Sequence, residues 1–157
     1  MTNPTPLDLG PEIADLVNGA LDSGNVLLLA AVDQEGKPHL SPRGSTGVYS
    51  GQQLSFWARN ARGGTIEAIR QNPYVALMYR SPKVPLLEFK GRARIATDEA
   101  ERQKVFALSH PREQQADPER KGVAVIVDLD QVSGVLGFDE KGPIFCNMAR
   151  DAPRTAS

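Results

Sequence analysis

Residues 41–73 read SPRGSTGVYSGQQLSFWARNARGGTIEAIRQNP, and this stretch decides the fold. Within it, two short segments, 47–49 and 53–57, are rich in apolar and aromatic residues. The Ser50-Gly51 turn separates them, which is typical of a β-hairpin. The first half of the stretch therefore predicts paired antiparallel strands.

The second half of the stretch changes from strand to helix. Gly63-Gly64 interrupts the extended pattern, and residues 65–71 then place Ile66 and Ile69 on one helical face. Pro73 cannot continue a helix, so the helix is expected to end just before it.

The rest of the chain predicts more strands than helices. Gly91 lies inside one long apolar segment, where it indicates a bulge. Asp98 with Glu101 three residues later forms a capping box that begins a helix. The expected elements are a helix over 11–21, a hairpin of 26–32 with 38–40, a strand over 74–79, a long strand over 86–95, a helix from Asp98, a strand over 123–127 and a closing hairpin of 132–138 with 144–146.

These elements predict one small, mainly β domain. The chain has 157 residues, a length typical of a single domain. About six to seven strands with short antiparallel links favour a closed barrel, because closure removes unpaired strand edges. The two tails, about 1–8 and 150–157, are expected to be flexible.

Composition excludes several classes of protein. The formal net charge of −1 disfavours a nucleic-acid-binding protein. Cys146 is the only cysteine, so neither an intrachain disulfide nor a thiolate metal cluster can form. The longest apolar run, 26–32, is too short to span a bilayer, and no signal peptide is recognisable. We therefore expect a cytoplasmic protein without a membrane segment.

The candidate site is the basic glycine turn before the short helix. Arg59 and Arg62 flank the start of that helix, where unpaired backbone N–H groups favour an anion. Thr65 adds a hydroxyl, and Gly64 allows close approach of a ligand. Trp57 lies just before the turn, as a planar phosphorylated ligand would require. The residues alone leave a second interpretation open, with Trp57 in the core and the arginines in a solvated loop.

Other motifs give no stronger site. The chain has only two histidines and no His-Glu-x-x-His pattern, so no zinc site is predicted. Neither a phosphate-binding Walker loop nor a Gly-x-Gly-x-x-Gly dinucleotide motif is present. His39 is expected on a strand surface, with a role as haem ligand a remote alternative, and Cys146 is expected to be a small buried residue.

The order of motifs resembles a known family. The order consists of a strand that ends in arginine, a hairpin, Phe-Trp-Ala-Arg-Asn-Ala, a basic glycine turn, a short helix and Asn-Pro. This order is similar to that of the FMN-binding split barrels, the pyridoxamine 5′-phosphate oxidase-like proteins. The resemblance covers about Ile13 to Phe138. It implies a six-stranded antiparallel split β-barrel of Greek-key type with peripheral helices, and a homodimer with FMN between the subunits.

The resemblance also implies a set of cofactor-binding residues. Glu88 and Lys90, on the long strand, are candidates for the partner subunit's share of the site. The full set carried over by position is Arg43, Ser45, Trp57, Arg59, Arg62, Gly64, Thr65, Glu88 and Lys90.

Departures from the family pattern limit what can be carried over. The pyridoxamine phosphate oxidases have a lysine where this chain has Val48, and an Arg-Lys pair where it has Gly64-Thr65. Their substrate-binding residues at the C-terminal end have no counterpart here. We therefore expect an FMN-dependent oxidoreductase that acts on a small molecule other than pyridoxamine phosphate. An F420-binding reductase and a non-catalytic flavin or haem carrier or sensor are the alternatives.

Overall fold

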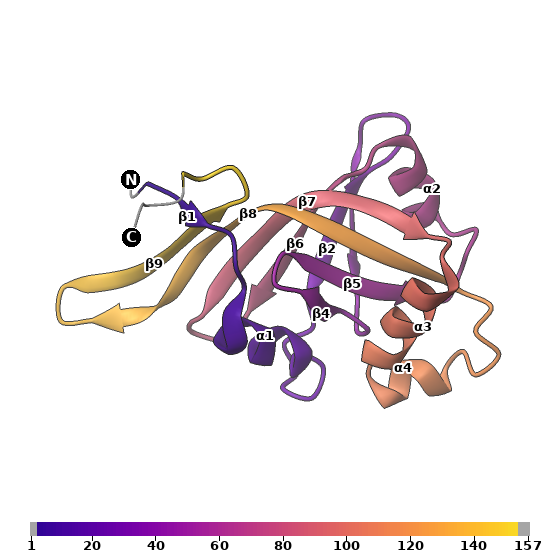
Figure 1. Cartoon of the computed structure of the whole chain (residues 1–157), viewed down its shortest axis with the longest axis horizontal. Helices are drawn as coiled ribbons and strands as arrows, with labels where there is room; N and C mark the ends of the chain where they lie inside the picture. The colour runs from indigo at the N-terminus through magenta and orange to yellow at the C-terminus, as the bar shows by residue number, and fades with distance from the viewer. Residues whose placement is uncertain (1–2, 154–157) are drawn as a thin grey trace.

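The computed structural model describes residues 3–153, and their strands and helices follow the mainly β pattern (Figure 1). The strands are β1 (Thr5–Pro6), β2 (Leu28–Val32), β3 (Pro38–Pro42), β4 (Gly47–Ser50), β5 (Gln53–Ala58), β6 (Tyr74–Arg80), β7 (Leu86–Ala96), β8 (Val123–Asp139) and β9 (Gly142–Ala149). The helices are α1 (Gly10–Asn18), α2 (Gly64–Gln71), α3 (Glu99–Leu108) and α4 (Pro111–Gln115).

Strand β8 organises the sheet. Strand β7 pairs along its whole length with residues 124–135 of β8. Strand β5 pairs with the first part of β8 and β9 with its last part, and all three pairings are antiparallel. Strands β6, β2 and β3 then continue outward from β7. The β8–β9 hairpin projects from the body on the side away from α3 and α4 (Figure 1). We call this hairpin, residues 132–149, the arm.

The main core lies on the inner face of this curved sheet. Alternate residues of the strands point inward, as the strand period of two requires, and α1 and α2 add apolar side chains from their buried faces. Fully buried members include Leu27, Leu29, Leu54, Phe56, Ile66, Leu77, Leu87, Phe89, Val127 and Leu129.

The expectation of a closed six-stranded barrel is wrong, because the hydrogen-bonded strands of this chain form an open sheet. Nine strands are described, and their ladder is open and branched at β8, with β1, β3 and β4 at its ends. Strand β1 also pairs parallel with β9, so the sheet is not purely antiparallel. The physical reason is that β8 shares its length between β5 and β9, which directs the sheet toward the arm instead of closing it.

The polar residues 128–131 were expected to separate two strands, but β8 runs through them. Their polar side chains lie on the outer face and are paired there: Arg92 Nη2 bonds Asp130 Oδ1 at 3.0 Å, and Gln53 Nε2 bonds Asp128 Oδ1 at 2.6 Å. Leu129 between them is fully buried. The predicted bulge at Gly91 is confirmed, since the β7–β8 register shifts there.

Both tails contact the sheet at the residues that the structure describes, and their flexibility stays a prediction. Thr5–Pro6 pairs with Met148 and Ala149, and Leu7 is buried. The amide of Arg150 donates to the carbonyl of Asp130 at 2.9 Å. Residues 1–2 and 154–157 lie outside the described part.

A second, smaller core fixes α3 and α4 to the sheet. The ring of Trp57 packs edge-to-face on Phe106 at 5.1 Å, and its Nε1 donates to Asp117 Oδ2 at 2.8 Å. The amides of Lys121 and Gly122 also donate to the Asp117 carboxylate, at 3.0 and 2.8 Å. Burial alone would raise the pKa of Asp117, but these three hydrogen bonds outweigh it and hold the pKa below its usual value.

We expect Asp117→Ala to lower the free energy of unfolding by about 2–4 kcal/mol, because three buried donors lose their acceptor. Urea denaturation at neutral pH measures this loss. A carboxylate whose pKa is lowered in the folded state stabilises above its unfolded pKa, about 4, and the contribution disappears as pH falls further. The difference between wild type and variant should therefore shrink below about pH 4.

The control is Asp130→Asn, which removes an exposed ion pair with Arg92. It should change stability by less than about 1 kcal/mol. An equal loss in both variants would contradict the role given to Asp117.

Candidate functional site

Three polar side chains share the inner face of the edge strand β3 and its continuation. His39 and Ser41 pair with the buried residues Ala31 and Leu29 of β2. The amide of Arg43 extends the ladder by donating to the carbonyl of Leu27 at 2.9 Å. Directly opposite residues in an antiparallel pair point to the same face. The inner face of β3 therefore carries polar side chains, whereas the inner face of the neighbouring strand β2 carries apolar ones.

Arg43 is the charged centre of this group. Its Nη2 donates to Thr65 Oγ1 at 2.5 Å, and its guanidinium carbon lies 5.2 Å from the centre of the Phe56 ring. Burial lowers the pKa of Arg43, and the nearby carboxylate of Glu113 partly offsets this. Among the described residues, no carboxylate forms an ion pair with Arg43. The half-buried cation is thus left without a bonded counter-charge.

Two hydrogen-bonding groups at this edge have no protein partner. They are Ser41 Oγ and Arg43 Nε, both buried. A buried donor without an acceptor costs about 1–3 kcal/mol, so native proteins rarely keep one without a reason.

Helix α2 brings backbone donors to the same place. Gly64 is its first residue and Thr65 its second, and the first-turn amides have no partner within the helix. A Cβ on Gly64 would meet no atom within 4 Å, so the space beside the helix start is open. The helix dipole also favours negative charge at this end.

A surface hollow opens at this point. It measures about 550 Å³ and is lined by Arg43, Arg59, Asn60 and Ala116. Arg43 thus contacts Thr65 and also faces the hollow. Two of the predicted site arginines, Arg43 and Arg59, are brought together here.

Ser45 and Trp57 are placed in structural contacts. The Ser45 hydroxyl donates to the carbonyl of Trp57 at 3.0 Å and accepts from its amide at 2.9 Å, which ties the loop after β3 to β5. The Trp57 indole belongs to the second core, under Arg102. The aromatic ring beside Arg43 is that of Phe56. A cofactor contact for Ser45 or Trp57 stays a prediction.

The remaining predicted residues do not join the Arg43 cluster. Arg62 is exposed and does not line the hollow. Glu88 and Lys90 form an ion pair of 3.4 Å on the outer face of β7. Lys90 lines a second hollow of about 410 Å³, together with Ala30, Tyr74, Ala76 and Gln131 among others.

Sequence reasoning missed three contributors: His39, Ser41 and Phe56. His39 Nε2 lies 3.1 Å from Thr65 Oγ1. The signal was present, because polar residues at 39, 41 and 43 alternate along a strand and must share a face. Which face they shared depended on the pairing of β3 with β2.

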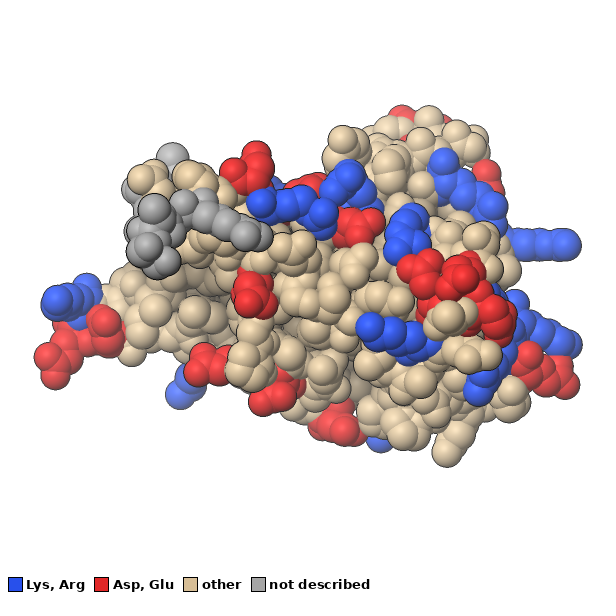
Figure 2. Space-filling model, viewed as in Figure 1, with Lys and Arg blue, Asp and Glu red and all other residues tan. Residues whose placement is uncertain are grey.

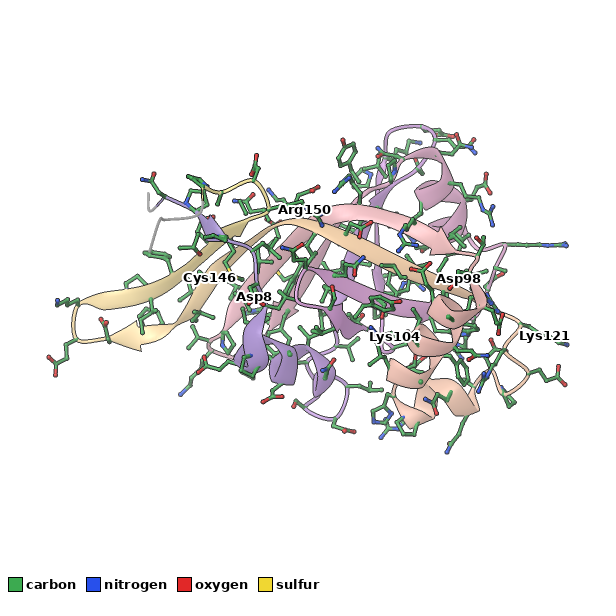
Figure 3. All side chains as sticks on the ribbon, viewed as in Figure 1. Asp8, Asp98, Lys104, Lys121, Cys146 and Arg150 are labelled. Atoms are coloured by element: carbon green, nitrogen blue, oxygen red, sulfur yellow. The ribbon has the colours of Figure 1, made fainter. Side chains whose placement is uncertain are left out.

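Other features of the described residues do not suggest another centre. Cys146 lies on β9 (Figure 3), where burial raises the pKa of its thiol, in line with the small buried residue expected. Searching residues 3–153 gives no group of three His, Cys, Asp or Glu side chains suited to a metal ion. None of their helices has the length and apolar character needed to cross a membrane.

Comparison with known proteins decides the family. Residues 11–134 match the family model for pyridoxamine 5′-phosphate oxidase. The chain belongs to this family. The match includes β3, α2 and the Arg43 cluster but ends at Gly134, so most of the arm lies beyond it. No curated protein sequence matches the chain.

Solved structures share the fold at low sequence identity. The Mycobacterium tuberculosis protein Rv2991 is 16% identical with a TM-score of 0.61, over 99% of this chain and 97% of its own. A Clostridium acetobutylicum protein of the pyridoxinephosphate oxidase family, related to general stress protein 26, is 13% identical with a TM-score of 0.59, over 82% and 89%. HupZ from Group A Streptococcus is 20% identical with a TM-score of 0.57, over 77% and 89%.

We expect Ser41→Ala to raise the free energy of unfolding of the ligand-free protein by about 1 kcal/mol, because it removes a buried hydroxyl without a partner. The same variant should weaken the binding of a phosphorylated ligand. Thermal melting and ligand titration measure the two effects.

The matched control is Ser55→Ala. Ser55 Oγ is also buried without a partner, but it lies on β5, away from β3. Its loss should stabilise to a similar extent and leave ligand affinity unchanged. If Ser41→Ala destabilised the protein, Ser41 would have a structural bond that we have not assigned.

Proposed function

We propose that this family member is an FMN-binding flavoprotein, with the FMN phosphate held by Arg43, Ser41, Thr65 and the first turn of α2. The observation that carries the proposal is the half-buried Arg43 guanidinium, which has no bonded carboxylate and an unpartnered Nε. Charge-assisted bonds to phosphate oxygens are the strongest that such a group makes.

The donor set suits a phosphate group. The Arg43 guanidinium bonds the Thr65 hydroxyl in the first turn of α2, and Arg43 and Arg59 both line the hollow. When bound, FMN would supply reversible hydride or electron transfer through its isoalloxazine ring. The protein would hold the phosphate, orient the ring and keep its surroundings dry.

The activity we propose is that of an oxidoreductase acting on a small molecule in the cytoplasm. At the positions where the pyridoxamine phosphate oxidases have basic residues, this chain has Val48 and Gly64-Thr65. We therefore propose a substrate other than pyridoxamine phosphate. Two alternatives are kept: the cofactor is F420 and not FMN, or the protein is a flavin or haem carrier or sensor without turnover. The binding experiment below distinguishes them.

We also propose a Greek-key split barrel in each subunit and a homodimer that uses the outer face of the sheet, with each flavin at the subunit interface. Register places Leu28, Met78 and Glu88 in one row across β2, β6 and β7. Val135 and Phe145 continue the face onto the arm. Phe138 and Phe145 are 66% and 62% exposed there, which is unusual for large apolar side chains.

The distribution of charge is consistent with this surface. Figure 2 shows charged side chains gathered over α3 and also over the middle of β7 and β8, whereas the visible part of the arm is largely uncharged up to its tip. In such a dimer, the hollow lined by Lys90 and Tyr74 would be the partner subunit's contribution to the flavin site.

We expect Arg43→Ala to raise the dissociation constant for FMN about 10- to 100-fold, because one charge-assisted contact is worth about 1.5–3 kcal/mol. Quenching of flavin fluorescence measures the affinity. Lys121→Gln, which neutralises an exposed lysine beyond α4 (Figure 3), should leave affinity unchanged.

Three alternative results have distinct meanings. If Arg43→Ala bound FMN as tightly as wild type, the site assignment would be wrong. If wild type bound F420 but not FMN, the cofactor would be the deazaflavin. Binding of FMN without turnover of any reduced nicotinamide would favour a carrier or sensor.

We expect the double variant Phe138→Ser/Phe145→Ser to weaken the dimer at least about 100-fold, since burying each phenylalanine contributes about 1.5–3 kcal/mol. Sedimentation velocity over a range of micromolar concentrations measures the change. Leu108→Ser, an exposed leucine at the end of α3, is the control. Unchanged association in the double variant would exclude the arm from the interface.

A further inference from the structure

His39 and Arg43 meet at one oxygen atom. His39 Nε2 lies 3.1 Å from Thr65 Oγ1, the atom to which Arg43 Nη2 donates. His39 itself is exposed on β3, whereas Thr65 is buried. The only other histidine, His110, is bonded to Asp22 at 2.8 Å and caps α4.

The hydrogen bonds of the Thr65 hydroxyl depend on the state of His39. A hydroxyl donates one hydrogen bond and accepts up to two. Arg43 always donates, so it occupies one acceptor position. If His39 Nε2 lacks a proton, Thr65 must donate to it. If Nε2 carries a proton, Thr65 accepts twice and its own proton is free for another acceptor.

We propose that His39 takes up a proton when the phosphate group of the ligand binds, which makes affinity dependent on pH. This inference rests on the phosphate site proposed above. The imidazolium would add a second positive charge beside Arg43 and would release the Thr65 proton toward a phosphate oxygen. Two neighbouring cations repel each other, so the second charge is favourable only while an anion lies with them.

Other charged groups near His39 do not supply this anion. Strand β2, its ladder partner, carries no ionisable side chain. In the turn before β3, Lys37 pairs with Glu35 at 2.7 Å, and Asp33 accepts backbone amides. Glu67 Oε1 accepts from Gln34 at 3.5 Å. The full set on the adjoining segments is Asp33, Glu35, Lys37, Arg43, Arg59, Arg62, Glu67 and Arg70, and the carboxylate of Glu113 on α4 lies near Arg43.

The test is FMN affinity measured by quenching of flavin fluorescence, from about pH 5.5 to about pH 8.5, the range in which imidazoles titrate. Wild type, His39→Gln and His110→Gln are compared. Glutamine keeps a neutral N–H donor but cannot take up a proton. The phosphate of FMN titrates in the same range, but its effect is common to all three proteins and cancels in the ratio of dissociation constants.

We expect His39→Gln to bind FMN about tenfold more weakly than wild type at the acidic end of the range and equally well at the alkaline end. A tenfold change corresponds to a rise of about one unit in the pKa of His39 when FMN binds. His110→Gln should follow wild type throughout. With riboflavin, which lacks the phosphate, the ratio for His39→Gln should not vary with pH. Calorimetry in two buffers of different ionisation enthalpy should show more proton uptake by wild type than by His39→Gln, and the difference between the two isolates His39 from the FMN phosphate.

The outcomes separate the two proposals. If wild type binds FMN but the ratio for His39→Gln is constant with pH, His39 has only a structural role and the inference is overturned. If wild type binds FMN at no pH, the proposed function fails and the inference falls with it. A thermal melt of each variant identifies any loss of folding.

Discussion

Most of this structure depends on the length of strand β8 and on how that length is shared. Pairing with β7 along 86–96 gives a continuous backbone ladder, and the inward side chains of both strands form the centre of the core. Strand β5 takes the first half of β8 and β9 the second, so the sheet divides into a curved body and an arm. The polar residues 128–131 do not interrupt this ladder, because their outward side chains are paired.

The candidate site follows from an edge that this arrangement leaves open. Strand β3 has a ladder partner only on one side among the described strands, and α2 reaches it through side-chain bonds at Thr65. An edge strand can carry polar side chains on its inner face because only one neighbouring strand packs against it. The cost is visible in Ser41 and Arg43, each of which keeps a buried atom without a protein partner. Two of the four such atoms among the described residues lie at this edge, which favours a binding site there.

Family membership and chemistry are therefore supported by different observations. The family follows from the match over 11–134 and from the shared fold. The proposed phosphate site follows from the residues of this chain. Thr65 and His39 lie near Arg43. Val48 and Gly64-Thr65 stand where the pyridoxamine phosphate oxidases have basic residues. A site with fewer fixed cations relies more on hydrogen-bond donors, and its affinity is then more sensitive to the protonation of a single histidine.

The sequence by itself determined the local structure: the hairpin of 47–49 with 53–57, the helix before Pro73, the helix N-cap at Asp98 and the bulge at Gly91 all follow from neighbouring residues. It also predicted that Arg59 and Thr65 lie beside the start of α2, because strand ends and helix starts are local features, whereas Arg43 was carried over from the resemblance to the family. The tertiary structure alone decided that the sheet stays open, that Trp57 turns to Asp117 while Phe56 lies by Arg43, and that His39 and Ser41 face inward. Those outcomes depend on which strands pair and in what register, and register is set by contacts between residues far apart in the chain.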